Sequence, residues 1–346
     1  KTENDAYVVS DENGIGIKVK AGKSNNAWGS GKAIIPYLGQ NAKAFDGKTL
    51  LTEFDITIPN DEALVGQNFF KINFSRKNPE SDAKGSKAHI KVGTRNNNGK
   101  YELYVVDDEY TMVNKYTAVA TADSIAALSG THHVKFAVDT SKMRIAAYGE
   151  DGTVSYIDGI DSTDINHDLR FYADTQVCAV FMGFDNLTGT TDKTVYFNNL
   201  SMKTLERGLT AAFAANGNDI TATFSENISQ SALDSAKYTV TKDGQEVSGA
   251  AVKATKTGDK TAKFTISGLE SATAYKLSVD GVFADSARTS NGALEYTFTS
   301  AKNYNDEKIL ISDSLINWRN SGWGEVYNKT ENDAYVVSDE NGIGIK

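Results

Sequence analysis

The amino-acid sequence predicts an all-β fold, made of two β-sandwiches that follow each other along the chain. Apolar and polar residues alternate with a period of two over most of the 346 residues, which is the pattern of half-buried strands. Glycine, asparagine and aspartate separate these segments, as in RNNNGK (95–100) and YGEDGT (148–153). A short helix is expected only in TADSIAALS (121–129).

The first sandwich is predicted over residues 1–205. In LLTEFDITIP (50–59), alternation places Phe54 and Ile56 on one strand face and Glu53 and Asp55 on the other. HHVKFAVD and MRIAAYGEDG, joined by TSK, predict a hairpin over 132–152. Further strands are expected in FFKINFS (69–75), AHIKVG (88–93), YELYVVD (101–107), VCAVFMGF (177–184) and TVYFNNLSM (194–202).

The second sandwich is predicted over residues 206–302, where strand patterns become shorter and richer in alanine, threonine, serine and lysine. Dipeptides such as NG (216–217) and DG (243–244) supply hairpin turns. Seven short strands in about 95 residues are typical of an immunoglobulin-like (Ig-like) sandwich, although the Cys…Trp…Cys core of that class is missing. The seven segments are LTAAFA, DITATFS, KYTVTK, EVSGAAVKA, TAKFTIS, AYKLSVDG and LEYTFTS.

The composition of the chain limits the classes of partner that it is expected to bind. The net charge of −9 argues against nucleic acid and against an anionic membrane surface, since both attract basic patches. No apolar run is long enough for a transmembrane helix, so membrane insertion is not expected. The single cysteine, Cys178, excludes an intrachain disulfide and is interpreted as a small core residue. These features are compatible with an extracellular or cell-surface location. The negative net charge leaves cations and neutral sugars as candidate ligands.

One phrase, KTENDAYVVSDENGIGIK, occurs twice without any difference, at 1–18 and at 329–346. Self-similarity at a fixed offset, here 328 residues, predicts a tandem-repeat arrangement. Residues 303–346 are then the opening strands of the next sandwich. The residues expected at this inter-repeat junction are Ile309, Ile311, Leu315, Trp318, Trp323, Tyr335 and Val337.

Two interpretations of this junction remain open. The repeat could reflect ordinary chain continuity within a covalent array. Alternatively, residues 309–346 could complete the sandwich of a separate subunit by non-covalent strand exchange, in which main-chain hydrogen bonds close an open sheet edge. In both cases the expected partners are neighbouring repeats or copies of the chain itself, arranged head to tail.

Residues 1–203, when preceded by a segment such as 309–328, resemble the concanavalin A-like (laminin-G-like) jelly rolls. The segments that carry this resemblance are ILISDSLINWRNSGWGEVYN, the hairpin HHVKFAVDTSKMRIAAYGEDG and the closing strand VYFNNLSM. The resemblance implies that residues 1–205 form a jelly roll lacking its first strands. This fold serves lectins, glycan-binding modules, glycosidases and adhesin spacers alike.

Residues 208–300 resemble the bacterial Ig-like repeats of surface-layer and adhesin proteins. The segments that carry the resemblance are ITATFSENISQSALDSAKYTVTKDG, GLESATAYKLSVDGVFADSARTSNG and LEYTFTS. It implies a stalk spacer with no chemistry of its own.

No catalytic pattern is complete. One family of jelly-roll glycosidases carries Glu-x-Asp-x-x-Glu on a strand, where paired carboxylates serve as nucleophile and acid. Here Glu53 and Asp55 are present, but Ile58 stands at the last position. His132 and His133 are expected on opposite faces of a strand, so they cannot share one metal ion. The sequence therefore predicts that the chain is not an enzyme.

Two ligand sites are predicted in loops. Calcium, the one cofactor considered, prefers oxygen ligands, which the acidic segment DGIDSTDINHD offers. The predicted ligands are Asp158, Asp161, Asp164, Asn166 and Asp168. The jelly-roll resemblance would instead place calcium between Asp313 and the closing strand, but that strand has Asn198 and Asn199. A polysaccharide is expected at Trp28, an aromatic platform beside Asn25 and Asn26 in a glycine-rich loop.

The sequence thus predicts a structural repeat of a long extracellular fibre, stalk or adhesin, assembled head to tail from jelly-roll and Ig-like units. The alternative is a glycan-binding, lectin-like module with an Ig-like spacer.

Overall fold

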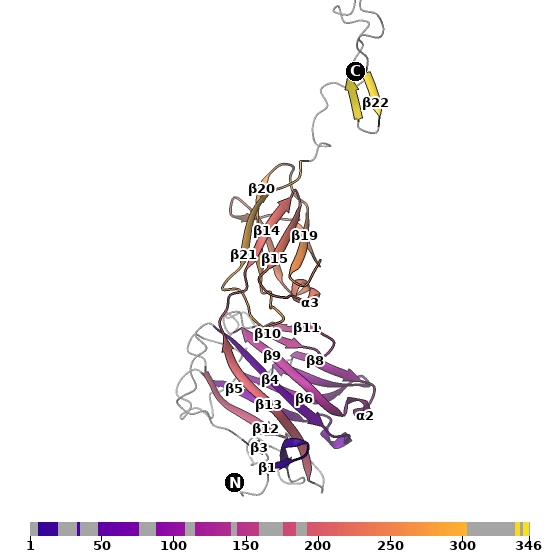
Figure 1. Ribbon diagram of the computed structural model, residues 1–346, viewed down its shortest axis with the longest axis vertical. Helices are drawn as coiled ribbons and strands as arrows, with labels where there is room; N and C mark the ends of the chain where they lie inside the picture. Colours follow the sequence, from indigo (N-terminus) through magenta and orange to yellow (C-terminus); the bar gives the residue numbers. More distant parts are fainter. Residues whose placement is uncertain are drawn as a thin grey trace, which may run out of the picture.

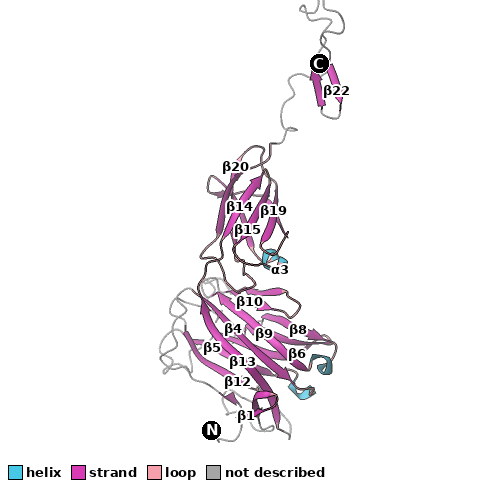
Figure 2. Cartoon of the chain, viewed as in Figure 1, coloured by secondary structure: helices cyan, strands magenta, loops and turns pink. Residues whose placement is uncertain are grey.

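The computed structural model describes residues 6–19, 33–34, 48–75, 88–107, 115–139, 144–158, 176–184, 192–302, 336–339 and 342–345. Within them the chain is almost entirely antiparallel β-structure, which confirms the predicted fold class (Figure 2). A jelly-roll sandwich is followed by an Ig-like sandwich stacked on one of its ends (Figure 1). None of the helices in these residues is long and apolar enough to cross a membrane.

The jelly-roll sandwich consists of two sheets. The seven-stranded sheet has, in order, β1 (Ala6–Asp11), β2 (Gly14–Val19), β13 (Lys193–Leu205), β4 (Thr49–Ile58), β9 (Gly130–Asp139), β10 (Arg144–Tyr148) and β11 (Val154–Asp158). The six-stranded sheet has β3 (Ala33–Ile34), β12 (Gln176–Gly183), β5 (Asn68–Ser75), β6 (Ala88–Asn97), β7 (Lys100–Asp107) and β8 (Lys115–Ala122). Two short helical segments, η2 (Glu62–Leu64) and α2 (Ile125–Leu128), accompany them.

The core of this sandwich follows the predicted alternation. On β4, Phe54, Ile56 and Ile58 are buried, while Glu53 and Asp55 on the opposite face are partly exposed. The ring centroid of Phe54 lies 4.6 Å from that of Phe70 on the opposing sheet, so the two sheets pack directly on each other. The expected helix is confirmed as the single turn α2, which begins where Ser124 Oγ accepts a hydrogen bond of 3.1 Å from the Ala127 amide.

The Ig-like sandwich has two four-stranded sheets. One consists of β14 (Ala211–Asn216), β15 (Asp219–Phe224), β19 (Thr261–Ser267) and β18 (Ala251–Lys256). The other consists of β17 (Gln245–Glu246), β16 (Lys237–Lys242), β20 (Ala274–Asp280) and β21 (Leu294–Thr299). The predicted DG turn joins β16 to β17, with Asp243 and Gly244 both at positive φ, as a tight hairpin turn requires.

Two details of this sandwich differ from the sequence prediction. EVSGAAVKA was expected as one strand, but it forms β17 and β18, which belong to different sheets. A turn at Val247–Ala250, with Gly249 at φ 89°, carries the chain from one sheet to the other. A helix, α3 (Gln230–Asp234), was not predicted; Ser229 begins it by accepting a 3.0 Å hydrogen bond from the Ala232 amide.

The second copy of the repeated phrase forms a two-stranded sheet of β22 (Val336–Asp339) and β23 (Gly342–Ile345). The domain boundaries after residues 205 and 302 stay predictions. Strand β13 ends at Leu205 and β14 begins at Ala211, so the chain passes from one sandwich to the other over a short segment.

Candidate functional site

The first copy of the repeated phrase forms a hairpin, β1–β2, that lies against the edge of β13. Strand β2 pairs with β13 from Val19↔Lys193 to Ile15↔Phe197. Ile17 is almost completely buried and joins the jelly-roll core, whereas Val8 and Ile15 remain about half exposed, at 53% and 54%. We call the surface of β13 that receives this hairpin, residues 193–198, the hairpin seat.

Side chains of the seat hold the hairpin turn. Asn198 Nδ2 donates a 3.1 Å hydrogen bond to the Asn13 carbonyl, and its Oδ1 accepts one of 3.3 Å from the Ile15 amide. The Tyr196 hydroxyl donates to Asp11 Oδ2 over 2.9 Å. Hydrogen bonds from the Asn13 amide and from Tyr196 lower the pKa of Asp11, and the contact with Asp11 raises the pKa of Tyr196. The Asn13 amide of the hairpin and Tyr196 of the seat therefore both favour the ionised carboxylate of Asp11.

The seat also requires glycine in the hairpin. A Cβ atom at Gly16 would lie 2.9 Å from ring atoms of Tyr196 and 2.9 Å from Val9. Gly14 has φ +107°, and a Cβ there would lie 2.1 Å from Asn198 Oδ1. A larger residue at either position would force Asn198 or Tyr196 to move away from the hairpin.

A second feature is the contact between the two sandwiches, which we call the seam. Its apolar centre combines jelly-roll residues with Phe283 and Ala287 from the Ig-like sandwich. The ring of Tyr156 on β11 lies 5.7 Å from that of Phe283, which is 1% exposed. The jelly-roll members of this cluster are Leu51, Ala137, Ala146 and Val154.

Arg144 on β10 is the main polar residue of the seam. It is 7% exposed, and its guanidinium donates to the carbonyls of Gly281, at 2.6 Å, and Ser235. The same group lies 4.0 Å from the ring centroid of Tyr156, a cation–π geometry. Because both carbonyls belong to the Ig-like sandwich, one side chain ties it at two points.

Further hydrogen bonds surround this centre. Tyr148 on β10 donates from its hydroxyl to the Ala284 carbonyl over 2.8 Å, and burial raises its pKa well above the usual value. Lys135 Nζ donates to the Asp285 carbonyl over 2.6 Å and lies 4.4 Å from the Tyr148 ring; burial lowers the pKa of Lys135.

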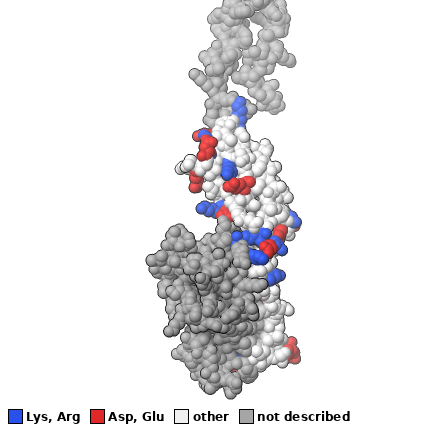
Figure 3. Space-filling model, turned by 90° about the vertical axis from the view of Figure 1, so that its left-hand side faces the viewer, with Lys and Arg blue, Asp and Glu red and all other residues white. Residues whose placement is uncertain are grey.

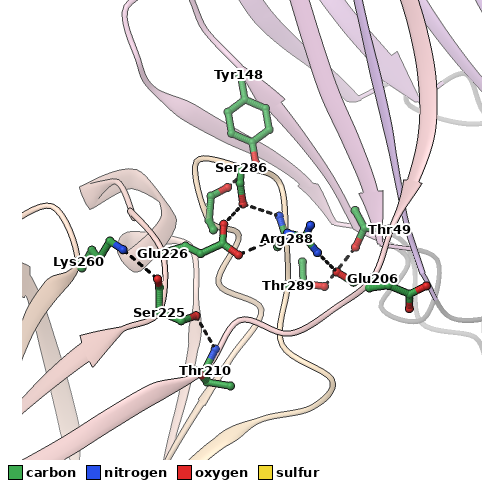
Figure 4. A network of polar contacts seen from close by, with 11 residues as sticks. Thr49, Tyr148, Glu206, Thr210, Ser225, Glu226, Lys260, Ser286, Arg288 and Thr289 are labelled. Atoms are coloured by element: carbon green, nitrogen blue, oxygen red, sulfur yellow. Dashed lines mark hydrogen bonds and ion pairs between the residues drawn. The ribbon is translucent and has the colours of Figure 1, made fainter.

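A polar network borders the seam on the side where the chain passes between the sandwiches (Figure 4). Arg288 donates from Nη1 to the Glu206 carbonyl over 2.9 Å, and its Nε lies 3.5 Å from Glu226 Oε1. The hydroxyls of Thr49 and Thr289 are 3.3 Å apart, across the two sandwiches. Arg207 in the connecting segment forms a buried ion pair with Asp139 at the end of β9. The passage is thus held from both sides.

A third candidate lies on the outer face of the six-stranded sheet. Leu103 and Val105 of β7 point into the core, so Glu102 and Tyr104 point away from it. Arg95 Nε donates to Glu102 over 2.6 Å, and the Arg95 guanidinium lies 4.0 Å from the centroid of Tyr116. The rings of Tyr104 and Tyr116 meet edge to face at 4.8 Å, and Tyr116 is 37% exposed. We call Arg95, Glu102, Tyr104 and Tyr116 the outer-sheet cluster.

Most of the ligand-binding and junction residues predicted from the sequence lie outside the described residues. Asp158 is the last residue of β11, and its side chain is not described. Val337, which was predicted at the inter-repeat junction, lies in β22, and its role there stays a prediction. Outside the described residues are Asn25, Asn26, Trp28, Asp161, Asp164, Asn166, Asp168, Ile309, Ile311, Leu315, Trp318, Trp323 and Tyr335. Among the described residues, no group of three or more His, Cys, Asp or Glu is arranged to hold a metal ion. The calcium and glycan sites stay predictions.

The residues weighed for catalysis have structural partners. Asp55 accepts a 2.6 Å hydrogen bond from Asn199 and lies 2.8 Å from His133 Nδ1; His133, followed by Asn199, lowers the pKa of Asp55. His132 instead contacts Glu150, with 3.0 Å between Nδ1 and Oε1. Cys178 lies in β12, where the pairing with β5 is irregular, and its side chain is not described.

Charged side chains show no segregation by sign on the face of the Ig-like sandwich seen in Figure 3. Acidic and basic residues are interspersed there. In the described part of that face, the basic patch that nucleic acid would need is therefore not seen.

Comparison with solved structures finds similarity to alginate lyases and to a neurotoxin domain. An alginate lyase from Pseudomonas aeruginosa matches 57% of this chain and 86% of its own, with 11% identity and a TM-score of 0.39. A family 7 alginate lyase from Zobellia galactanivorans matches 59% of this chain and 83% of its own, with 12% identity and a TM-score of 0.34. The ligand-binding domain of botulinum neurotoxin serotype D, in complex with N-acetylneuraminic acid, matches 91% of both chains, with 11% identity and a TM-score of 0.32.

These matches correct one prediction. The chain was expected not to be an enzyme, and that exclusion is wrong, because solved structures similar to it are alginate lyases. The incomplete carboxylate pattern at Glu53 and Asp55 excludes one mechanism and not the others that this fold supports. At 11–13% identity these matches assign no activity to the chain.

No curated protein matches the chain. The family comparison identifies its second part: residues 199–300 match the family described as the bacterial Ig-like domain, which agrees with the resemblance inferred over 208–300.

Proposed function

We propose that this chain is a structural repeat of a long extracellular fibre, stalk or adhesin, in which jelly-roll and Ig-like units assemble head to tail. The match to a bacterial Ig-like domain supports a place in a bacterial surface protein. A protein of this kind has to keep its domains in a fixed order and direction. The seam is the observation that carries this proposal.

Domains in one chain usually move relative to each other unless their interface is large and apolar. Here Phe283 and Ala287 bury an apolar centre, and Arg144 and Tyr148 bind carbonyls of the opposite sandwich. Since these contacts come from β10 of one sandwich and from 281–287 of the other, they restrict rotation as well as separation. A stalk unit that does not bend at its domain junction follows from this arrangement.

A distance measurement tests this rigidity. Spin labels on Ala126→Cys in α2 and Gln245→Cys in β17, in a Cys178→Ala background, place one probe on an exposed site of each sandwich. We expect a single narrow distance distribution by pulsed electron paramagnetic resonance. Arg144→Met should broaden it and should destabilise the protein by about 1–3 kcal/mol, because two buried carbonyls lose their donor.

Lys263→Met is the matched control, since it removes a cation from an exposed pair with Asp219 on the other sheet of the Ig-like sandwich. It should leave the distribution unchanged. A broad distribution in the parent chain would contradict a rigid stalk unit.

A second candidate function is glycan binding by the jelly roll, with the Ig-like sandwich as spacer. The outer-sheet cluster favours it, because Tyr116 offers a partly exposed ring beside the Arg95 guanidinium. Aromatic rings with nearby hydrogen-bonding groups fit sugar faces and hydroxyls. The predicted platform at Trp28, with Asn25 and Asn26, is the alternative place for the same ligand. Calcium at Asp158, Asp161, Asp164, Asn166 and Asp168 is a separate proposal.

Pull-down with acidic and neutral polysaccharides tests this candidate. If the outer-sheet cluster binds, Tyr116→Ala should weaken retention about tenfold or more, which corresponds to the loss of one stacking contact. Trp28→Ala should then leave binding unchanged. The opposite result would place the site in the predicted loop, and retention that neither substitution weakens, or no retention at all, would reject both sites.

A further inference from the structure

We propose that the hairpin seat on β13 also accepts the β22–β23 hairpin of a second copy of this chain, so that the tail of one copy completes the seven-stranded sheet of the next. This inference rests on the proposed head-to-tail assembly and names its binding site. It is an interaction surface whose partner is another copy of the same protein.

The two hairpins of the chain have the same sequence and the same strand pairing. Their sequences are identical over 1–18 and 329–346. Their pairing is also the same: Val8↔Ile17, Ser10↔Ile15 and Asp11↔Gly14 in the first become Val336↔Ile345, Ser338↔Ile343 and Asp339↔Gly342 in the second. The two hairpins therefore pair their strands in the same register.

The groups that recognise the hairpin belong to the seat. Tyr196 and Asn198 are residues of β13, and they bind Asp11, Asn13 and Ile15 of the first copy. Asp339, Asn341 and Ile343 occupy the same positions in the second copy. The incoming hairpin can therefore make each of these contacts without any change in the seat.

The glycine requirement is met by both copies. Gly342 and Gly344 stand where the first copy has Gly14 and Gly16, the two positions at which a Cβ atom would clash with Asn198 and Tyr196. The seat thus favours a hairpin with glycine at these two positions, and the second hairpin has glycine at both.

Only one hairpin can occupy the seat at a time. The opposite edge of β13 is already paired with β4, from Tyr196↔Thr57 to Leu205↔Thr49. The hairpin of the same chain has the advantage of a high effective concentration, so it holds the seat in dilute protein. Exchange of identical elements between copies follows when that advantage is removed, as in domain swapping.

The repeated phrase allows a matched test, because one substitution can be made in either hairpin. Gly16→Val places side-chain atoms against Tyr196 and Val9 and should expel the first hairpin from its seat. We expect this variant to form concentration-dependent oligomers in analytical ultracentrifugation, since its second hairpin is intact. Gly344→Val should remain monomeric, and the double variant should lose the oligomers of the single variant.

A binding measurement gives a second readout. A labelled peptide with the sequence of residues 329–346 should bind the double variant, whose seat lacks a competing hairpin, and bind the parent chain at least about tenfold more weakly. Asn198→Leu in the double variant should weaken peptide binding about tenfold, because two hydrogen bonds to the hairpin turn are lost.

Three results would overturn the inference. Gly16→Val could remain monomeric at high concentration, which includes the case of its own tail folding back into the seat. The double variant could still form oligomers, or the peptide could fail to bind. The proposed stalk function fails by a different result, a broad distance distribution between the two sandwiches, so the two failures can be told apart.

Discussion

Replacing Arg207 with methionine is expected to lower the free energy of unfolding by about 3–5 kcal/mol. The side chains of Arg207 and Asp139 are 10% and 4% exposed, and Arg207 Nη2 donates to Asp139 Oδ1. Asp139 ends β9, where it pairs with Thr49 of β4 and Arg144 of β10. Without the guanidinium, a carboxylate that is only 4% exposed loses its ion pair with Arg207. Urea denaturation followed by intrinsic fluorescence measures the loss.

Lys48→Met is the control for this variant. Lys48 forms an ion pair with Glu206, which directly precedes Arg207 in the sequence. The side chains of Lys48 and Glu206 are 38% and 70% exposed, so loss of this ion pair should lower the free energy of unfolding by less than about 1 kcal/mol. Adding Asp139→Leu to Arg207→Met should recover part of the stability, because the buried charge is then gone as well. Equal effects of Arg207→Met and Lys48→Met would show that the buried pair contributes no more than a surface pair.

Phe283→Ala is expected to destabilise the protein by about 3–5 kcal/mol and to uncouple the unfolding of the two sandwiches. Phe283 is 1% exposed and packs against Tyr156 of the jelly roll, so its removal opens a cavity in the centre of the seam. In calorimetry the parent chain should unfold in one cooperative transition. The variant should show two, with the Ig-like sandwich unfolding independently.

Phe213→Ala is the comparison for this substitution. Phe213 packs on Tyr296 and Phe264 inside the Ig-like sandwich, with ring centroids 5.4 and 6.5 Å away. Its loss should lower stability without separating the transitions. If Phe283→Ala kept a single transition, the seam would not be the element that couples the sandwiches.

Much of the fold could be predicted from the sequence because strand burial follows local alternation. Phe54, Ile56 and Ile58 lie on the predicted face of β4, and the Asp243–Gly244 turn has the predicted conformation. The split of EVSGAAVKA into β17 and β18 was missed, because the turn that divides it contains one glycine in an otherwise strand-like composition. Helix α3 was missed because five residues carry almost no periodic pattern.

The candidate sites were predictable to different degrees. The hairpin seat follows from the repeat, since an identical phrase suggests an identical partner strand. The seam could not be found this way: Arg144 and Gly281 are 137 positions apart, and carbonyl acceptors have no sequence signature. Ala146 and Phe283 look like ordinary core residues of separate domains until the fold brings them together. The outer-sheet cluster was missed because Arg95 lies in a turn-like run of asparagines.

Strand β13 extends from the hairpin seat at Lys193 to Leu205, which packs against the seam cluster. Tension that enters through a docked hairpin would therefore pass along one continuous backbone directly into the segment that Arg207 anchors. In the docked hairpin β23 takes the place of β2, so its antiparallel hydrogen bonds to β13 would be pulled along the strand direction and would have to break together instead of one after another. The strand that binds the neighbouring copy would therefore also carry the mechanical load through the unit.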